Sequence, residues 1–324
     1  MKFVLFALMM GESEFLPGDL AKDKVFRIGR VVSALSYFAG IVMIFLGLIS
    51  LIKVGLGISN FSMPQTAQGM LGGGLIFCSA NGLISRYLIK GLLHPSGRLI
   101  AFLLPFGSAL FIVVYRELVI NSSEKLESYK RTITEGSLVE WMGFLALVAS
   151  AILLLKAARN REPNASRYLL LSASAVCFLV GMEEMSWGQM IFNWDTPSFV
   201  GQYNVQDETG FHNLWFIHQQ TWIIGALVMT LFLLLSLSGF LLRSLGLVRP
   251  LSFADMLLPL GCTASYFLVA SVFYWLTVVD KSGAGLVFFH SSEQEIGELF
   301  FYCGILIHSV YAYLISPRSR GALE

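Results

Sequence analysis

Apolar runs, each close to 20 residues long, recur along this chain and are separated by polar stretches. A helix rises about 1.5 Å per residue, so a run of this length crosses the roughly 30 Å hydrocarbon core of a bilayer. The pattern predicts an all-α fold, a polytopic transmembrane helix bundle of about eight spans. The expected spans cover residues 32–52, 67–89, 99–120, 138–157, 167–185, 221–242, 255–279 and 295–316.

The segments outside these spans are short, with one exception. Residues 1–31 form a cytoplasmic or interfacial N-terminal segment, residues 32–316 form the transmembrane domain, and residues 317–324 form a cytoplasmic tail. The exception is the connection of residues 183–220, which contains too many Trp and Phe residues for a disordered linker. We expect this connection to be structured, with a short helix from Trp187 to Trp194 lying in the membrane interface.

The composition agrees with a membrane protein. Hydrophobic residues make up 56% of the 324 residues and charged residues 13%, against roughly 25% charged residues in soluble domains. The mean hydropathy is +0.70. The four cysteines lie inside apolar runs without zinc-type spacing, which is typical of small core residues. No surface outside the bilayer combines aromatic and basic residues, so the sequence excludes a nucleic-acid partner.

The distribution of Lys and Arg predicts the orientation. Sixteen of the 22 Lys and Arg residues fall on the side that holds both termini, and six fall on the other side. Cytoplasmic loops of membrane proteins accumulate positive charge, so we expect both termini in the cytoplasm of a cell whose inner membrane the chain crosses. The 183–220 connection then lies at the outer face. All six tryptophans fall near the same outer boundary, as interfacial aromatic residues do.

The outer connection concentrates acidic, amide and imidazole side chains and contains no Lys or Arg. Carboxylates at membrane depth are costly and usually face a cavity, which makes them candidates for function. The spacing of Glu208 and His212 places a carboxylate and an imidazole one helical turn apart, and the spacing of Glu295 and Glu298 does the same for two carboxylates. The predicted catalytic residues are Glu184, Glu208, His212, Glu295 and Glu298.

These residue types support two kinds of chemistry. They can act as general acids and bases, or they can bind a divalent metal, with Glu208, His212 and Glu298 as candidate ligands. Arg116, a positive charge on the outer side, can hold a phosphate or pair with Glu183 or Glu184. The predicted substrate-binding residues are Arg116, Trp187, Gln189, Asn204, Gln206 and Asn213. Alternatively, Glu293, Glu295 and Glu298 have no functional role and are the solvated polar start of the last predicted helix.

The outer connection also carries a motif, E-E-x-S-W-G-Q followed by D-T-P and then by N-x-Q-x-E-x-x-x-H-N, between Glu183 and Asn213. The motif resembles one found in bacterial polytopic inner-membrane proteins that have no established activity. The resemblance covers this stretch alone. It implies a site in the connection and no particular reaction.

Three functions fit the predicted site. The first is an enzyme, a hydrolase or group transferase, that acts at the outer leaflet on a lipid or lipid-linked substrate. The second is a non-catalytic assembly or anchoring subunit whose outer connection docks a membrane-protein partner. The third is a transporter in which the acids form a cation or proton path. The absence of charges at mid-membrane and of an inverted repeat argues against the third.

Overall fold

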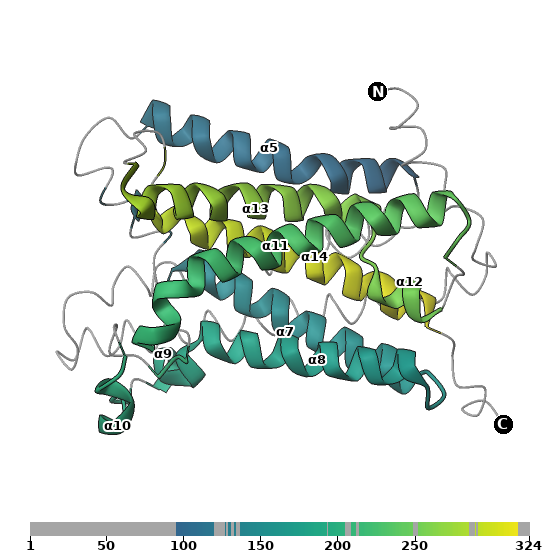
Figure 1. The fold of residues 1–324 in the computed structure, drawn as a ribbon, viewed down its shortest axis with the longest axis horizontal. Helices are drawn as coiled ribbons and strands as arrows, with labels where there is room; N and C mark the ends of the chain where they lie inside the picture. Colours follow the sequence, from purple (N-terminus) through teal and green to yellow (C-terminus); the bar gives the residue numbers. More distant parts are fainter. Residues whose placement is uncertain are drawn as a thin grey trace, which may run out of the picture.

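The computed structural model describes a helical protein (Figure 1). Within the described residues there are no strands, and an isolated bridge joins Asn204 to Leu214. The spans expected at 32–52 and 67–89, the N-terminal segment and the tail lie outside the described residues. These are residues 95–119, 127, 129–130, 133, 137–192, 194–204, 209–211, 214–248, 252–284, 289 and 291–316.

In the described part of the chain, six long helices are accompanied by short helical elements. The six are α5 (Pro95–Val119), α7 (Leu138–Arg159), α8 (Ala165–Glu184), α11 (Trp215–Ser244), α13 (Ala264–Val279) and α14 (Gln294–Ile315). The short elements are η2 (Ser186–Gly188), α9 (Gln189–Phe192), α10 (Ser198–Gly201), α12 (Phe253–Leu257), η3 (Gly261–Thr263), η4 (Asp280–Ala284) and η5 (Ser291–Glu293).

Five helical segments in the described part of the chain are long and apolar enough to cross a membrane. They are Val139–Arg159, Ala165–Glu184, Gln220–Ser244, Phe253–Gly283 and Gln294–Ile315. The protein is therefore membrane-embedded. The span expected at 99–120 is not among the five, because the apolar part of α5 covers Ala101–Val114 and is flanked by the buried charges of Arg98 and Arg116.

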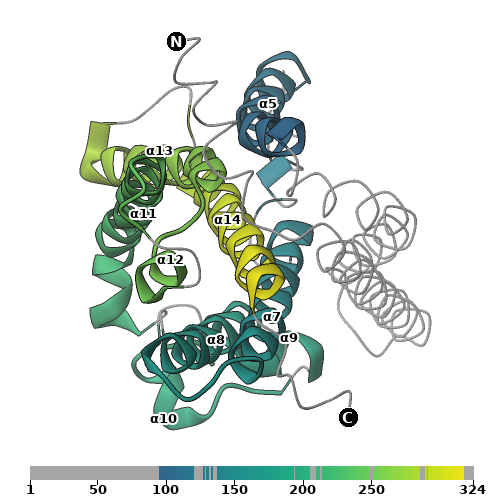
Figure 2. The same ribbon diagram turned by 90° about the vertical axis from the view of Figure 1, so that its right-hand side faces the viewer.

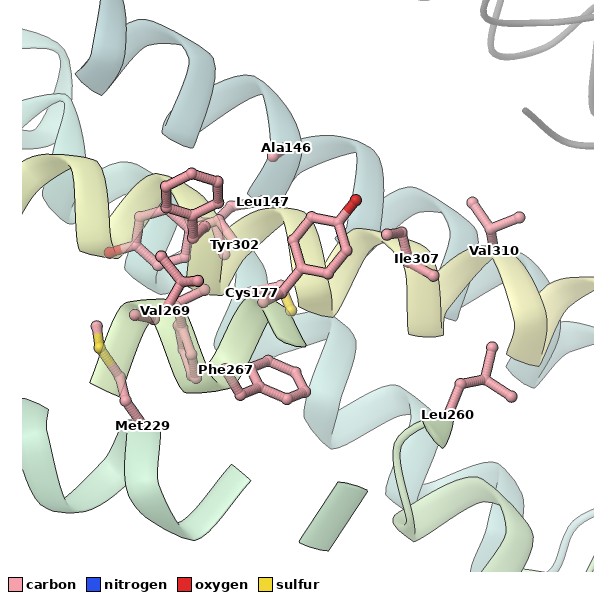
Figure 3. Close-up of a cluster of buried hydrophobic side chains, with 14 of the residues drawn as sticks. Ala146, Leu147, Cys177, Met229, Leu260, Phe267, Val269, Tyr302, Ile307 and Val310 are labelled. Carbon is pink, nitrogen blue, oxygen red and sulfur yellow. The ribbon is translucent and has the colours of Figure 1, made fainter. Parts of the chain in front are cut away.

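The helices form two groups that α14 joins (Figure 2). In one group α13 packs against both α5 and α11, and in the other α7 packs against α8. α14 contacts α13 on one side and α7 on the other. Phe232, Phe267 and Phe301 bring α11, α13 and α14 together, with ring centroids 5.0 to 5.5 Å apart. Figure 3 shows Phe267 in the buried core that surrounds these rings.

The bundle has two chemically different ends. We call the end where α8 finishes and α14 begins the acidic end, and it carries Glu184, Glu295 and Glu298. The opposite end, where α7 and α11 finish, is the arginine end, and it carries Arg161 and Arg243. In Figure 1 the acidic end lies on the left, together with α9 and α10.

The span expected as one helix over 255–279 is interrupted. α12 ends at Leu257, and the buried residues 258–260 are not helical. Pro259 lies within this break, and a proline has no N–H to continue the helical hydrogen bonds. Carbonyl groups freed at such a break need other donors in a membrane. The Ser236 hydroxyl of α11 donates to the Leu260 carbonyl at 2.6 Å.

Arg243 satisfies the remaining carbonyls of the break. Its guanidinium donates to the backbone oxygens of Asp255, Leu258 and Pro259, and it forms an ion pair with the Asp255 carboxylate at 2.9 Å. The Asp255 side chain is buried. One side chain of α11 thus fixes the position of α12 and of the break that follows it.

Candidate functional site

Three helices bring four carboxylates together at the acidic end. Glu140 lies in the first turn of α7, Glu184 ends α8, and Glu295 and Glu298 lie near the start of α14. Glu184 lies close enough to Glu298 to interact electrostatically, and Glu295 interacts with Glu298, Glu184 and Glu140. The side chains of Glu184, Glu295 and Glu298 are half-buried. The structure therefore brings together the three catalytic candidates that it describes.

Two tyrosines donate hydrogen bonds to this cluster. The Tyr302 hydroxyl of α14 donates to Glu184 Oε1 at 2.7 Å, and the Tyr274 hydroxyl of α13 donates to Glu298 Oε1. Gln294 Nε2 lies 3.4 Å from Glu295 Oε1. A carboxylate that is bonded to a hydroxyl can exchange a proton through it, since Tyr both donates and accepts. The cluster thus contains two carboxyl–hydroxyl pairs suited to proton transfer.

Two glycines allow the tyrosine rings to lie directly on neighbouring helix backbones. A Cβ atom on Gly143 of α7 would lie 3.0 Å from Tyr302 Cδ2, and a Cβ atom on Gly225 of α11 would lie 2.2 Å from Tyr274 Cε1. Neither position has room for a larger residue without movement of the ring. The packing of α7 against α14 and of α11 against α13 therefore sets where each hydroxyl points.

Arg116 has a different partner from those expected. Its Nη1 atom lies 2.8 Å from Oε2 of Glu293, and the Tyr129 hydroxyl donates to Oε1 of the same carboxylate at 2.9 Å. The expected pairing with Glu183 or Glu184 is not formed, because α5 packs on α13 while α8 lies beyond α14 (Figure 2). The alternative of a solvated helix start does not describe Glu293 either, since this residue is 2% exposed.

Glu183 joins the connection of residues 183–220 to the end of α8. Its carboxylate accepts hydrogen bonds from the Trp187 indole N–H and from the Phe211 backbone N–H, the latter at 2.8 Å. The rings of Trp187 and Phe211 meet edge to face, with centroids 5.9 Å apart. Adjacent helical residues point about 100° apart. Glu183 therefore faces the connection while Glu184 faces the carboxylate cluster.

The helix expected from Trp187 to Trp194 is shorter than predicted and begins after a sharp turn. Ser186, Trp187 and Gly188 have positive φ angles of 44°, 55° and 92°, which reverse the chain, and α9 then covers four residues. A side chain at Gly188 would meet the Trp194 ring at 3.3 Å. The predicted short helix from Trp187 is wrong in its start, because the turn occupies residues 186–188 and the α-helix begins only at Gln189.

Two predicted substrate-binding amides hold the connection together. Gln189 Oε1 accepts from the Thr209 backbone N–H at 2.7 Å and from its hydroxyl at 2.8 Å, and Gln189 Nε2 donates to the Thr196 hydroxyl at 3.0 Å. Asn204 Nδ2 donates to the Gly210 carbonyl at 3.1 Å. These contacts are structural. A role of Gln189 and Asn204 in substrate binding stays a prediction.

Four predicted site residues lie outside the described residues, namely Gln206, Glu208, His212 and Asn213. Their relation to Glu184 stays a prediction, as does a metal bound by Glu208, His212 and Glu298. Among the residues that the structure describes, no group of three or more His, Cys, Asp or Glu side chains is arranged to hold a metal ion.

Sequence reasoning missed the tyrosines. Tyr302 follows Glu298 by four residues, a spacing that places both on one helix face and was available as a signal. For Tyr274 the partner lies on another helix, and no spacing within the sequence indicates it.

Comparison of the chain with models of protein families, with curated proteins and with solved structures finds no match.

Proposed function

We propose that this protein is a membrane enzyme, a hydrolase or group transferase, that acts on a lipid or lipid-linked substrate. The observation that carries the proposal is the convergence of Glu184 and Glu298 from two helices, each bonded to a tyrosine hydroxyl. An ionised carboxylate serves as a general base and a protonated one as a general acid. Two interacting carboxyl groups can supply both roles.

The location of the cluster supports a lipid-borne substrate. The cluster lies at the ends of apolar helices that are long enough to cross a membrane, where the head groups of lipids are found. The residues Glu184, Glu295 and Glu298 are half-buried, so the cluster is not sealed within the core. A substrate anchored in the bilayer would present its polar group at this depth, so the membrane itself would orient it toward Glu184.

Replacing Glu184 with Gln removes the proton-exchanging group and keeps the size of the side chain. We expect turnover to fall at least about 100-fold, the smaller end of the usual contribution of acid–base catalysis. The measurement is mass spectrometry of lipid products from proteoliposomes made with a total bacterial lipid extract. Glu298→Gln should behave in the same way.

Glu162→Gln is the matched control, because Glu162 is exposed between α7 and α8 at the arginine end. It should retain wild-type turnover. If the wild-type protein converts no lipid, or if Glu184→Gln converts lipids as fast as Glu162→Gln, the enzyme proposal fails. The anchoring-subunit hypothesis would then take its place.

We also propose that the acidic end faces outward, with both termini in the cytoplasm of a cell inner membrane. The distribution of Lys and Arg supports this orientation. Single cysteines at Ser198 and Asn164, both exposed and at opposite ends, should differ in labelling by an impermeant thiol reagent added to intact cells. A chain without its native cysteines is the background. Labelling at position 164 and protection at 198 would mean the reverse orientation.

A second candidate function is a proton- or cation-coupled transporter. The interrupted span over Phe253–Gly283 favours it, because broken helices commonly form ion and substrate sites in transporters. The carbonyls at this break, however, accept hydrogen bonds from Arg243 and Ser236. This makes the break a less suitable ion site than the carboxylate cluster.

A further inference from the structure

The connection between α8 and α11 exposes a group of large aromatic side chains. We call this group the aromatic platform. Their exposed fractions run from 43% for Trp194 to 71% for Phe199. Five exposed large aromatic side chains within residues 192–211 are unusual for a segment in water. The platform consists of Phe192, Trp194, Phe199, Tyr203 and Phe211.

We infer that the aromatic platform is embedded in the interfacial layer of the lipid bilayer at the acidic end. The platform belongs to a segment whose two ends are the end of α8 and the start of α11. Both helices carry exposed apolar side chains close to that segment, such as Leu179 on α8 and Ile223 on α11. These side chains face hydrocarbon. The platform therefore lies where hydrocarbon gives way to head groups, beside the end of the bundle (Figure 1).

The residue types of the platform fit this layer. Tryptophan and tyrosine concentrate at membrane interfaces, because their rings are apolar while the N–H or O–H group needs a polar partner. The connection of residues 183–220 has five carboxylates and no Lys or Arg. Anionic head groups would be repelled by this charge, so the chemistry favours uncharged or zwitterionic lipids over an acidic surface.

The platform is held in a defined shape. The rings of Phe192 and Trp194 stack with centroids 5.4 Å apart and an interplanar angle of 14°. The Gln189 amide ties α9 to Thr196 and Thr209 on either side of α10. Glu183 then joins the connection to α8. Side chains that already pack on a neighbouring ring, as Phe192, Trp194 and Phe211 do, lose little conformational entropy when they enter the interface.

The platform is also close to the carboxylate cluster along the chain. Glu183, which receives the hydrogen bonds from Trp187 and Phe211, is the neighbour of Glu184. Insertion of the platform would therefore fix the depth of Glu184 relative to the head groups. This inference does not depend on the proposed enzymatic function, because an anchoring subunit or a transporter could use the same platform.

Depth measurement by spin labelling tests the inference. A nitroxide is attached to Phe199→Cys in the full chain without its native cysteines, reconstituted in phosphatidylcholine bilayers. Its collision rates with oxygen, which concentrates in lipid, and with a water-soluble nickel chelate are compared. Leu179→Cys on α8 gives the lipid-facing reference, and Glu162→Cys gives the aqueous one. We expect the oxygen-to-nickel ratio at position 199 to exceed the Glu162 reference several-fold and to lie below the Leu179 reference.

Two results would overturn the inference. A ratio at position 199 equal to that at 162 would mean that the platform stands in water. Protection of position 199 from both reagents would mean that a protein surface, such as a second copy of this chain, covers it. A label at Tyr203→Cys repeats the measurement at a second site, so that local disturbance by one label does not decide the outcome.

Discussion

Replacing Arg243 with Met is expected to lower the free energy of unfolding by about 3–5 kcal/mol, the range for breaking a buried ion pair. The change leaves the buried Asp255 carboxylate without this cation and removes donors from the carbonyls of Leu258 and Pro259. Inside a membrane these groups cannot form replacement hydrogen bonds with water. Equilibrium unfolding in mixed micelles measures the loss.

Arg159→Met is the matched control, because Arg159 is exposed in the last turn of α7 at the same end of the bundle. Its effect should stay within about 0.5 kcal/mol. Adding Asp255→Leu to Arg243→Met should restore part of the stability, since the uncompensated charge is gone. Equal stability of Arg243→Met and Arg159→Met would show that other contacts hold the break.

Replacing Glu293 with Gln is expected to cost a similar amount, about 3–5 kcal/mol. The amide can still accept from Tyr129, but it removes the negative charge that faces the buried Arg116 at 2.8 Å. The loss should appear as a lower unfolding free energy in micelles. Because Arg116 lies on α5 and Glu293 lies just before α14, the change should also loosen α5 from the rest of the bundle.

The double variant Arg116→Met with Glu293→Gln tests whether the charge is the cause. Removing both charges should recover most of the stability, because burying a paired charge is itself costly. Glu127→Gln serves as the control at an exposed position. A double variant as unstable as Glu293→Gln alone would contradict the prediction and would point to packing around Tyr129 instead.

The sequence predicted the spans best where apolar length alone decides the structure. The ranges 138–157, 167–185 and 295–316 agree closely with α7, α8 and α14, because a bilayer requires about 20 apolar residues in a helix. The interruption of the span at 255–279 was missed, although Pro259 was a visible signal. Hydropathy reflects the apolar character of side chains and does not detect that Pro259 lacks a backbone N–H. The count of eight spans stays a prediction beyond the five that the described residues contain.

The sequence predicted which acidic residues belong to the site, but it did not predict their hydrogen-bond partners. The spacing and position of the acidic residues predicted that Glu184, Glu208 and His212 converge with at least one of Glu295 and Glu298, and among the described residues Glu184 does interact with both. Which side chain bonds to which depends on helix neighbours and rotations that a single sequence does not contain. The partner of Arg116 follows from the position of α5, and the Tyr274 hydroxyl reaches Glu298 because Gly225 leaves room for its ring.

The rings of Tyr274 and Tyr302 pack directly against Gly225 and Gly143. The hydrogen bonds that these tyrosines donate to Glu298 and Glu184 therefore depend on helix position. A shift of α11 along α13 by one residue, about 1.5 Å, would push the Tyr274 ring and lengthen its bond to Glu298 beyond the usual hydrogen-bond range. The same holds for α7 and the bond between Tyr302 and Glu184. Bilayer thickness acts on helix tilt and sliding. A change of bilayer thickness that shifts these helices would therefore alter both tyrosine–carboxylate contacts without any molecule entering the cluster.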